Sequence, residues 1–202
     1  EKIDAMNINW GGMDIDLSKK FIRRPFFELL SEATGHDMAD LDEKKLREIC
    51  TEKEISIDDD FNLGQILDEL MSELVEPKLI QPTFVIDYPK EISPLAKAHR
   101  NGNPSIVERF ELFIGGAEFA NSFSELNDPI DQRNRLEAQA LLRERGDDEA
   151  QPIDENFIQA MECGMPPTGG VGIGIDRLTM LLTGNRWIKD VILFPILRSE
   201  NI

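Results

Sequence analysis

Apolar residues at helical spacing predict a helix-rich segment in the first half of the chain. Between residues 62 and 77 they recur every three or four positions and form one stripe: Leu63, Ile66, Leu67, Leu70, Met71, Leu74 and Val75. A weaker stripe precedes it in residues 38–50, where we expect Met38, Leu41 and Ile49 to face inward and the charges to face solvent. We interpret residues 25–77 as a small helical subdomain.

Short β-like runs separated by turn residues predict a mainly antiparallel sheet in residues 78–202. The runs are "PTFVIDYP", "RFELFI", "AEFANSFSEL", "VGIGI" and "DVILFP", and Gly115 and Gly116 predict a tight turn between the second and third. Three helices are expected among them. One begins at the N-cap Asp128 and stops at Gly146, one runs from a capping Asp154 to Gly164, and one follows "VGIGI" with Asp176 as its cap. This order indicates an α+β fold.

The hairpin carries acidic residues among apolar ones. With the turn at the glycine pair, Phe113 faces Glu118, and Glu111 becomes a diagonal neighbour of Glu118 on the same side of the sheet. Such neighbours lie roughly 7–8 Å apart at the backbone. Two carboxylates at that distance could share a hard divalent cation such as magnesium. The alternative is a solvated face on which the two acids never meet.

Asn121, Phe123 and Glu125 alternate, so they share one face of the third run. The amide could bind the backbone of an amino acid, the ring could line an aliphatic stem, and the carboxylate could pair with an ammonium group. The alternative is a half-exposed strand beside a core phenylalanine. Strict alternation places Glu118 on the opposite face from Asn121, so convergence of these groups requires a β-bulge around Phe119 and Ala120.

The run "GGVGIGIDRL" alternates glycines with apolar side chains. Gly172 and Gly174 would leave a bare strip on which a flat ring can lie. Arg177 follows in the first turn of the next helix, where a guanidinium suits phosphate. The apolar side chains expected to point into a core are Val171, Ile173 and Ile175. Alternatively, the glycines serve close packing and the arginine forms a surface ion pair.

Composition limits the partners and the compartment. The 202 residues include 22 basic and 39 acidic ones, a net charge of -17, so this chain should not bind nucleic acid tightly by itself. Two lone cysteines suggest a reducing compartment, the cytoplasm, and no apolar run approaches the ~20 residues of a membrane helix. We therefore expect no membrane partner. The chain lacks an initiator methionine, which suggests a piece of a longer protein.

Several stretches resemble one enzyme family over residues 24–202. "GVGIGIDRLTMLLTG" followed by "IKDVILFP" resembles motif 3 of the class II aminoacyl-tRNA synthetases, in the aspartyl, asparaginyl and lysyl branch. "GGAEFANSFSELNDPIDQ", "LIQPTFVIDYPKEISPLA" and "PPTGGVGIGIDR" resemble the lysyl-tRNA synthetases. The departures are mild: Phe119, Ala120 and Phe123 stand where Ile, a small residue and Tyr are common.

The resemblance implies part of the class II catalytic fold and a role for each candidate residue. Glu111 and Glu118 match the carboxylates that hold magnesium bridging the phosphates of ATP. The lysine pocket would be formed by Asn121, Phe123 and Glu125, with Glu125 nearest the ε-ammonium. Gly172 and Gly174 match the strip beneath adenine, and Arg177 matches the catalytic motif 3 arginine on ATP.

The reaction implied by the resemblance has two steps. Lysine and ATP give lysyl-adenylate, and the lysyl group then passes to tRNA(Lys), in a homodimer when the protein is full-length. Residues 1–202 contain no recognisable anticodon-binding domain and neither motif 1 nor motif 2, so they match the C-terminal portion of the catalytic domain. We expect the isolated chain to be inactive, and pyrophosphate exchange by it would contradict this.

Three alternatives remain open. One is a paralogue that lysylates a protein such as elongation factor P, although its motif 3 usually departs from the G-x-G-I-D-R form found here. A second is an aspartyl or asparaginyl enzyme, whose hairpins differ at Glu125 and Asn127. The third is a non-catalytic module that binds an amino acid, which would tolerate loss of Glu111, Glu118 or Arg177.

Overall fold

The computed structural model describes residues 6–38, 42–144 and 150–195 of the chain, and its centre is a five-stranded sheet. The strand order is β3-β4-β5-β6-β7; β3 pairs parallel to β4, and the other pairs are antiparallel. The prediction of a mainly antiparallel α+β fold is confirmed. The strands are β3 Ile22–Pro25, β4 Thr83–Ile86, β5 Arg109–Ile114, β6 Ala117–Ser124 and β7 Gly169–Ile173.

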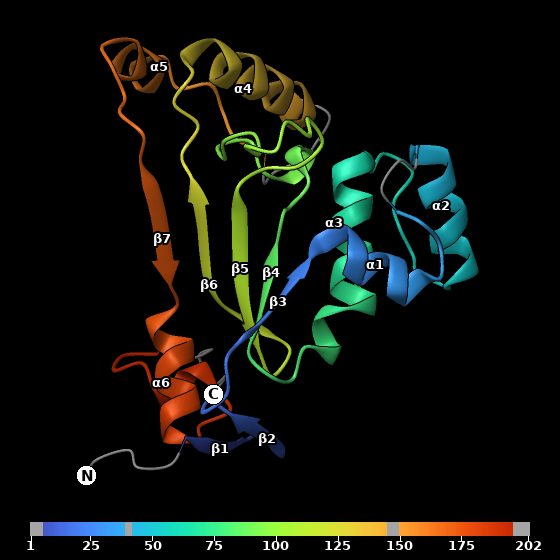
Figure 1. Ribbon diagram of the computed structural model, residues 1–202, viewed down its shortest axis with the longest axis vertical. Coiled ribbons are helices and arrows are strands. Elements are labelled where there is room, and N and C mark those ends of the chain that lie inside the picture. Colours follow the sequence, from blue (N-terminus) through green and yellow to red (C-terminus); the bar gives the residue numbers. More distant parts are fainter. Residues whose placement is uncertain (1–5, 39–41, 145–149, 196–202) are drawn as a thin grey trace, which may run out of the picture.

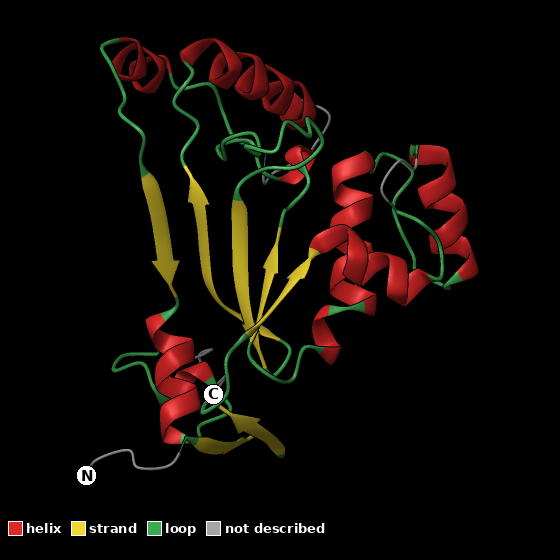
Figure 2. Ribbon diagram, in the orientation of Figure 1, coloured by secondary structure: helices red, strands yellow, loops and turns green. Residues whose placement is uncertain are grey.

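Helices surround the sheet on three sides (Figures 1 and 2). The first group, α1 Phe26–Thr34, α2 Glu43–Glu52 and α3 Leu63–Leu74, lies beside β3 and β4. Helices α4 Pro129–Glu144 and α5 Glu155–Glu162 lie beyond one end of the strands. At the other end are α6 Ile175–Thr183 and the hairpin of β1 Asn7–Trp10 and β2 Met13–Asp16. Short 3-10 turns are η1 Glu76–Lys78, η2 Lys90–Ile92 and η3 Ile188–Asp190.

The apolar stripe of residues 63–75 forms α3 as predicted. Asn62 and Gln65 cap its start reciprocally in a capping box. The stripe buries Ile66, Leu70 and Met71 in the main core, which also includes Phe113 of β5. Met38 and Ile49 are buried as expected, whereas Leu41 lies outside the described residues. Helix α1 was not predicted individually.

The β5–β6 hairpin has the predicted register and the predicted bulge. Phe113 lies opposite Glu118, and the register shifts beyond this pair so that Leu112 lies opposite Ala120. Phe119 is therefore the extra residue of β6. Because the bulge changes the parity of the strand, Glu118 lies on the same face as Asn121. Phe119 packs its ring edge-to-face against Trp10 of β1, with centroids 5.8 Å apart.

Helices α4 and α5 begin where the capping residues predict. Asp128 accepts a hydrogen bond from the backbone N–H of Ile130 at 2.9 Å, and Asp154 caps α5 through Phe157. The predicted stop of α4 at Gly146 lies outside the described residues. No helix within the described ranges is long and apolar enough to cross a membrane.

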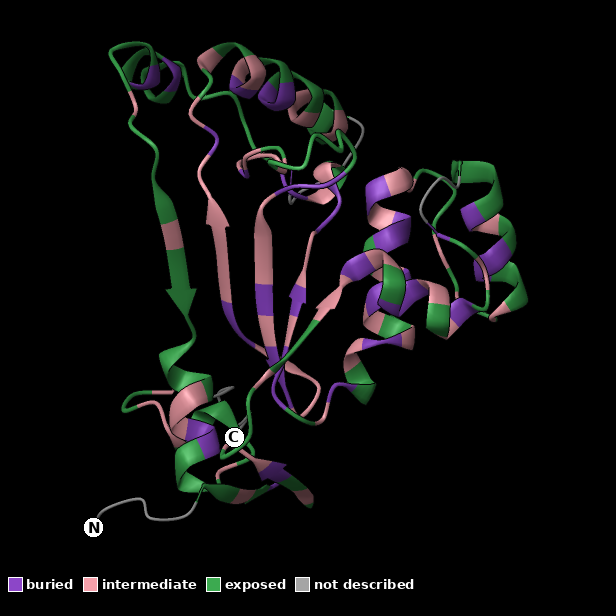
Figure 3. Cartoon of the chain, viewed as in Figure 1, coloured by how far each residue is buried: buried purple, intermediate pink, exposed green. Residues whose placement is uncertain are grey.

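Three predictions for the C-terminal part are wrong. The run "DVILFP" is not a strand: turns and bends follow η3, and Phe194 is 91% exposed, because no described strand pairs with it. The side chains expected in a core are exposed. Val171 and Ile173 lie on the edge strand β7, and nothing in the described part of the chain covers that face of it (Figure 3), while Ile175 lies in the first turn of α6. Asp176 does not cap α6, which starts one residue earlier, after Gly174.

Candidate active site

The bulge places the candidate residues in rows across one face of the sheet. Each row consists of residues that pair with one another across β5, β6 and β7, and β7 contributes only glycines to the rows. The rows are Phe113 with Glu118; Glu111, Asn121 and Gly172; and Arg109, Phe123 and Gly170. Since glycine adds no side chain, the face opens to solvent toward β7, whereas Glu111 near the middle is buried.

Glu111 is buried and firmly hydrogen-bonded. Its Oε1 accepts from Nη2 of Arg109 at 2.5 Å and from Nδ2 of Asn121 at 3.1 Å. Its Oε2 accepts from the hydroxyl of Tyr88 at 2.7 Å. Burial raises the pKa of Tyr88 well above its ordinary value, so this hydroxyl stays a neutral donor. A carboxylate has about four acceptor positions, so Glu111 retains roughly one, on Oε2.

Glu118 and Arg177 meet at one edge of the face. Nη1 of Arg177 donates to the backbone carbonyl of Glu118 at 2.6 Å and lies 3.7 Å from its carboxylate. Burial and then the charge of Glu111 raise the pKa of Glu118, although Arg177 opposes them. The arginine therefore forms only a loose, half-exposed ion pair in this structure.

Five of the candidate residues surround a single hollow of about 270 Å³: Glu118, Asn121, Gly172, Gly174 and Arg177. A Cβ added at Gly172 or Gly174 would approach the nearest atom, a backbone oxygen, no closer than 3.6 Å. Packing within the described chain thus does not require glycine at these positions. The bare strip is open space, as expected for a surface that receives a flat ring.

A second hollow, about 260 Å³, adjoins the first at Asn121. Phe123 and Arg109 line it on the sheet side, and residues 92–96 form the opposite wall. Glu125 comes two residues after Phe123 and lines a third hollow of about 320 Å³, beside Lys97 and Thr168.

Gly170 determines where the carboxylate of Glu125 lies. A Cβ added at Gly170 would come within 2.4 Å of Oε1 of Glu125, so the carboxylate lies directly over the glycine. Burial raises the pKa of Glu125. Gly170 was not among the predicted site residues, although its spacing of two residues from Gly172 places it on the same face. The same alternation relates Arg109 to Glu111 and could have indicated Arg109 too.

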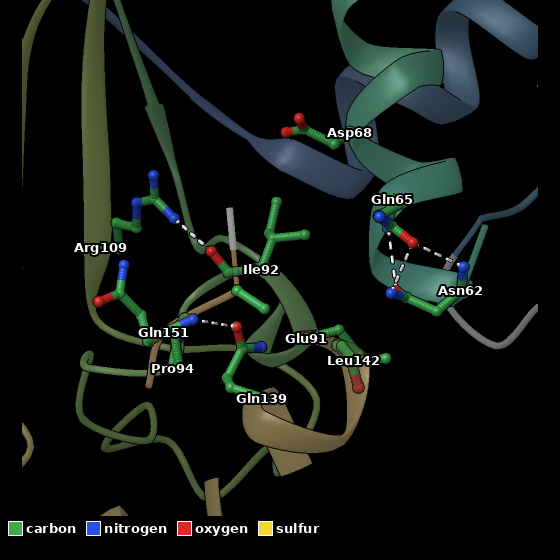
Figure 4. Close-up of a pocket in the computed structure, with 11 residues that line it drawn as sticks. Asn62, Gln65, Asp68, Glu91, Ile92, Pro94, Arg109, Gln139, Leu142 and Gln151 are labelled. Atoms are coloured by element: carbon green, nitrogen blue, oxygen red, sulfur yellow. Dashed lines mark hydrogen bonds between the residues drawn. The ribbon is translucent and has the colours of Figure 1, made fainter. Parts of the chain in front are cut away.

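Another hollow that the sequence did not predict lies between α3 and α4 (Figure 4). Its volume is about 310 Å³, and its walls are mainly polar, with Asn62 and Asp68 on one side and Gln139 on the other. The residues that it shares with the hollow beside Asn121 are Ile92, Pro94, Arg109 and Gln151. Arg109 therefore stands between two adjoining hollows.

Glu111 and Glu118 could hold magnesium only if substrate phosphates supply further ligands to the ion. The described residues contain no group of three or more histidine, cysteine or acidic side chains that could hold a metal ion. Glu111 and Glu118 nevertheless share a face, and the charge of Glu111 raises the pKa of Glu118. A cation would relieve this repulsion. Magnesium binds in this way through one or two carboxylates when substrate phosphates complete its shell.

Replacing Glu76 by glutamine should stabilise the fold at neutral and alkaline pH. Burial, followed by the charges of Asp68 and Glu111, raises the pKa of Glu76 to about 7. Between the ordinary pKa near 4.5 and about 7 the folded chain binds more protons than the unfolded chain, so the free energy of unfolding falls as pH rises. We expect Glu76→Gln to add about 1 kcal/mol at pH 8, since solvent screens a half-buried carboxylate.

Denaturant unfolding at pH 4 and pH 8 measures this effect. The gain should vanish at pH 4, where Glu76 is protonated in both states. Glu73→Gln, at an exposed position of α3 just before η1, is the matched control. A gain of the same size at both pH values would show that charge at Glu76 is not its cause.

The chain matches the family model "tRNA synthetases class II (D, K and N)" over residues 2–198. It is 50% identical over 95% of its length to the lysine–tRNA ligase of Porphyromonas gingivalis, 55% identical over 94% to that of Gloeobacter violaceus, and 48% identical over 98% to that of Leuconostoc mesenteroides. These matches cover 33%, 38% and 40% of the three relatives, so the chain spans about a third to two fifths of their length.

These similarities support the expectations drawn from the motifs. The resemblance to lysyl-tRNA synthetases is confirmed by the names of all three relatives, and the α+β architecture with its mainly antiparallel sheet agrees with the expected fold class. The family model covers nearly all of residues 1–202. The chain therefore belongs to the class II tRNA synthetases of the D, K and N group.

Proposed function

We propose that this chain is part of an enzyme that activates lysine with ATP and transfers it to tRNA(Lys). The observation that carries the proposal is the single hollow that joins Glu118, Asn121, Gly172, Gly174 and Arg177. Asn121 also lines the next hollow together with Phe123, and Glu125 lines a third hollow. The first hollow, with the guanidinium of Arg177 at its edge, suits a nucleotide. The second, lined by the amide of Asn121 and the ring of Phe123, suits an amino acid beside it.

The chain would form the C-terminal portion of the catalytic domain of a cytoplasmic homodimer. Within it we assign residues 25–77 to a helical subdomain and residues 78–202 to the active-site sheet and motif 3. Strand β3, which precedes residue 78, also belongs to that sheet.

The ATP side of the proposed site has three parts. Gly172 and Gly174 leave the space for adenine, and Arg177, in the first turn of α6, offers its guanidinium to the phosphates. Glu111 and Glu118 would hold magnesium, which when bound neutralises phosphate charge. Glu111 can contribute its remaining acceptor position on Oε2, whereas the half-exposed Glu118 has its carboxylate more freely available.

The lysine side would be formed by Asn121 and Phe123 of β6 and by Glu125, which directly follows that strand. Glu125 would pair with the ε-ammonium, because burial makes an isolated negative charge costly and a cation compensates that cost. Phe123 would line the aliphatic stem, and Asn121 would bind the backbone end of the amino acid. Asn121 keeps one N–H for this purpose, because its side-chain amide uses only one of two with Glu111.

The chemistry is two successive transfers. In the first, a carboxylate oxygen of lysine attacks the α-phosphorus of ATP, the bond to the β-phosphate oxygen breaks, and pyrophosphate leaves. In the second, a terminal hydroxyl of tRNA attacks the lysyl carbonyl and AMP leaves. The side chains named here supply position and charge rather than covalent bonds, which suffices for phosphoryl and acyl transfers of this kind.

Amino-acid-dependent exchange of pyrophosphate into ATP by the full-length protein tests the proposal. We expect exchange with lysine and none with aspartate or asparagine, followed by charging of tRNA(Lys). Exchange that depends on aspartate or asparagine would contradict the lysine assignment. Lysylation of elongation factor P without charging of tRNA would contradict the second step.

Gly170→Ala should weaken lysine binding without damaging the fold. The new methyl group would come within 2.4 Å of Oε1 of Glu125 and would displace that flexible carboxylate. We expect KM for lysine to rise about 10-fold, the equivalent of one weakened charged hydrogen bond. In the full-length enzyme, steady-state exchange kinetics measure KM and kcat, and kcat should change little.

Gly169→Ala is the matched control, because its added methyl would meet only the carbonyl oxygen of Phe123 at 3.9 Å. Equal effects of the two substitutions would show that displacement of Glu125 is not responsible.

A further inference from the structure

Arg109 uses most of its hydrogen-bond donors in bonds to other residues of the protein. Nε donates to Oδ1 of Asn121 at 3.3 Å, and Nη2 donates to Oε1 of Glu111 at 2.5 Å. Nη1 donates to the carbonyl of Ile92 at 2.7 Å and to Oγ of Ser93 at 2.9 Å. These bonds use four of the five N–H groups of a guanidinium. Its side chain is only 16% exposed, so little of it is available to a substrate.

These contacts fix the orientation of the Asn121 amide. A guanidinium can only donate and an ionised carboxylate can only accept. Asn121 must therefore turn its oxygen to Arg109 and its nitrogen to Glu111, as the structure shows. With the amide flipped, both contacts would be lost.

Arg109 also holds the opposite wall of the hollow beside Asn121. Its bonds to Ile92 and Ser93 reach the segment that faces Asn121 and Phe123 across this space. The guanidinium carbon lies 4.6 Å from the centre of the Tyr88 ring, which supports it from another side. One side chain thus sets both the orientation of Asn121 and the position of residues 92 and 93.

We propose that Arg109 is a positioning residue for the amino-acid substrate, which acts through Asn121 and the wall at residues 92 and 93. This inference rests on the proposed function and deepens it, because it assigns amino-acid affinity to a side chain outside the predicted site. Loss of the N–H donors of the Arg109 guanidinium should lower the affinity for lysine. The affinity for ATP should change little, because Arg109 does not line the hollow assigned to ATP.

Arg109→Lys in the full-length enzyme is the main test, because lysine keeps the positive charge beside Glu111 but cannot make the four directed bonds. Calorimetry without ATP measures the Kd for lysine, and exchange kinetics measure KM for ATP. We expect the Kd for lysine to rise about 10-fold and KM for ATP to change less than 2-fold. Ser93→Ala, which removes a single acceptor, should raise the Kd about 3-fold.

Arg133→Lys is the matched control, since Arg133 forms a two-bond pair with Glu155 between α4 and α5, outside the proposed site. It should leave both constants unchanged.

A double-mutant cycle separates positioning from a general structural effect. Because Arg109 acts through both Asn121 and the wall at residues 92 and 93, Arg109→Lys should cost less lysine affinity in the Asn121→Ala background than it costs alone. Additive losses would overturn the inference, as would a lower Tm with equal losses of lysine and ATP binding. An unchanged Kd for lysine in Arg109→Lys would overturn the inference alone. Absence of lysine binding by the unmodified enzyme would overturn the proposed function and this inference together.

Discussion

Replacing Arg177 by alanine in the full-length enzyme should lower kcat for lysine-dependent pyrophosphate exchange by about 10³-fold, the usual effect of removing one preorganised charge from a transition state. Arg177 lies in the first turn of α6 at the edge of the hollow assigned to ATP. In the proposed reaction, negative charge would develop there as pyrophosphate departs. Its side chain is about half exposed, and its contacts are a carbonyl and a carboxylate of the same residue, Glu118.

The fold should survive this substitution, because removing a half-exposed side chain leaves no cavity and no buried partner. Circular dichroism and Tm should therefore remain those of the unmodified enzyme. Arg177→Lys, which keeps the charge without the planar fork, should recover only part of the rate. A loss below 10-fold in Arg177→Ala would show that the surface ion pair with Glu118 is the whole role of this arginine.

Replacing Glu125 by glutamine should lower kcat/KM for lysine by about 10²-fold, which corresponds to about 3 kcal/mol for a charged hydrogen bond that loses one charge. The substitution keeps the shape of the side chain over Gly170 and removes only the negative charge. The loss should appear mainly in KM, since the proposed function assigns Glu125 to the far end of the substrate rather than to the reacting atoms. Glu162→Gln, at an exposed position of α5, is the control.

The pH profile gives an independent readout for Glu125. Burial raises the pKa of this carboxylate, so its charged form is lost at a higher pH than for an ordinary glutamate. Lysine affinity should therefore fall as pH is lowered through that raised pKa and should be level above it. Glu125→Gln should show no such dependence. A decline of the same shape in the variant would assign the titration to another group.

The β-bulge links these predictions. Convergence of Glu118 and Asn121 on one face required the bulge, which was therefore predicted from the sequence, and the structure has it at Phe119. The anchor of the bulge could not be read from the chain: Phe119 is held by Trp10, more than 100 residues earlier. We infer that the hairpin of β1 and β2 contributes to the site indirectly. It stabilises the bulge at Phe119, and the bulge places Glu118 on the same face as the other site residues.

Local patterns predicted several elements correctly where neighbours in sequence decide the outcome. Asp128 begins α4, Asp154 begins α5, and the glycine pair gives the hairpin its register, because caps and turns are satisfied within a few residues. The alternation of Asn121 and Phe123 likewise gave their shared face of β6. Short-range geometry of this kind needs no information about the rest of the molecule.

The tertiary structure alone decided whether the C-terminal apolar segments are covered and which side chains meet across the fold. The run at residues 190–195 is apolar enough for a strand but has no described strand to pair with, and β7 is exposed because a sheet edge is covered only by other segments. The network of Arg109 joins β5 to residues 92 and 93, and the raised pKa of Glu76 depends on Asp68 and Glu111. Hydrogen bonds, desolvation and interactions between charges depend on which residues lie close together in space. The order of residues along the chain does not specify this.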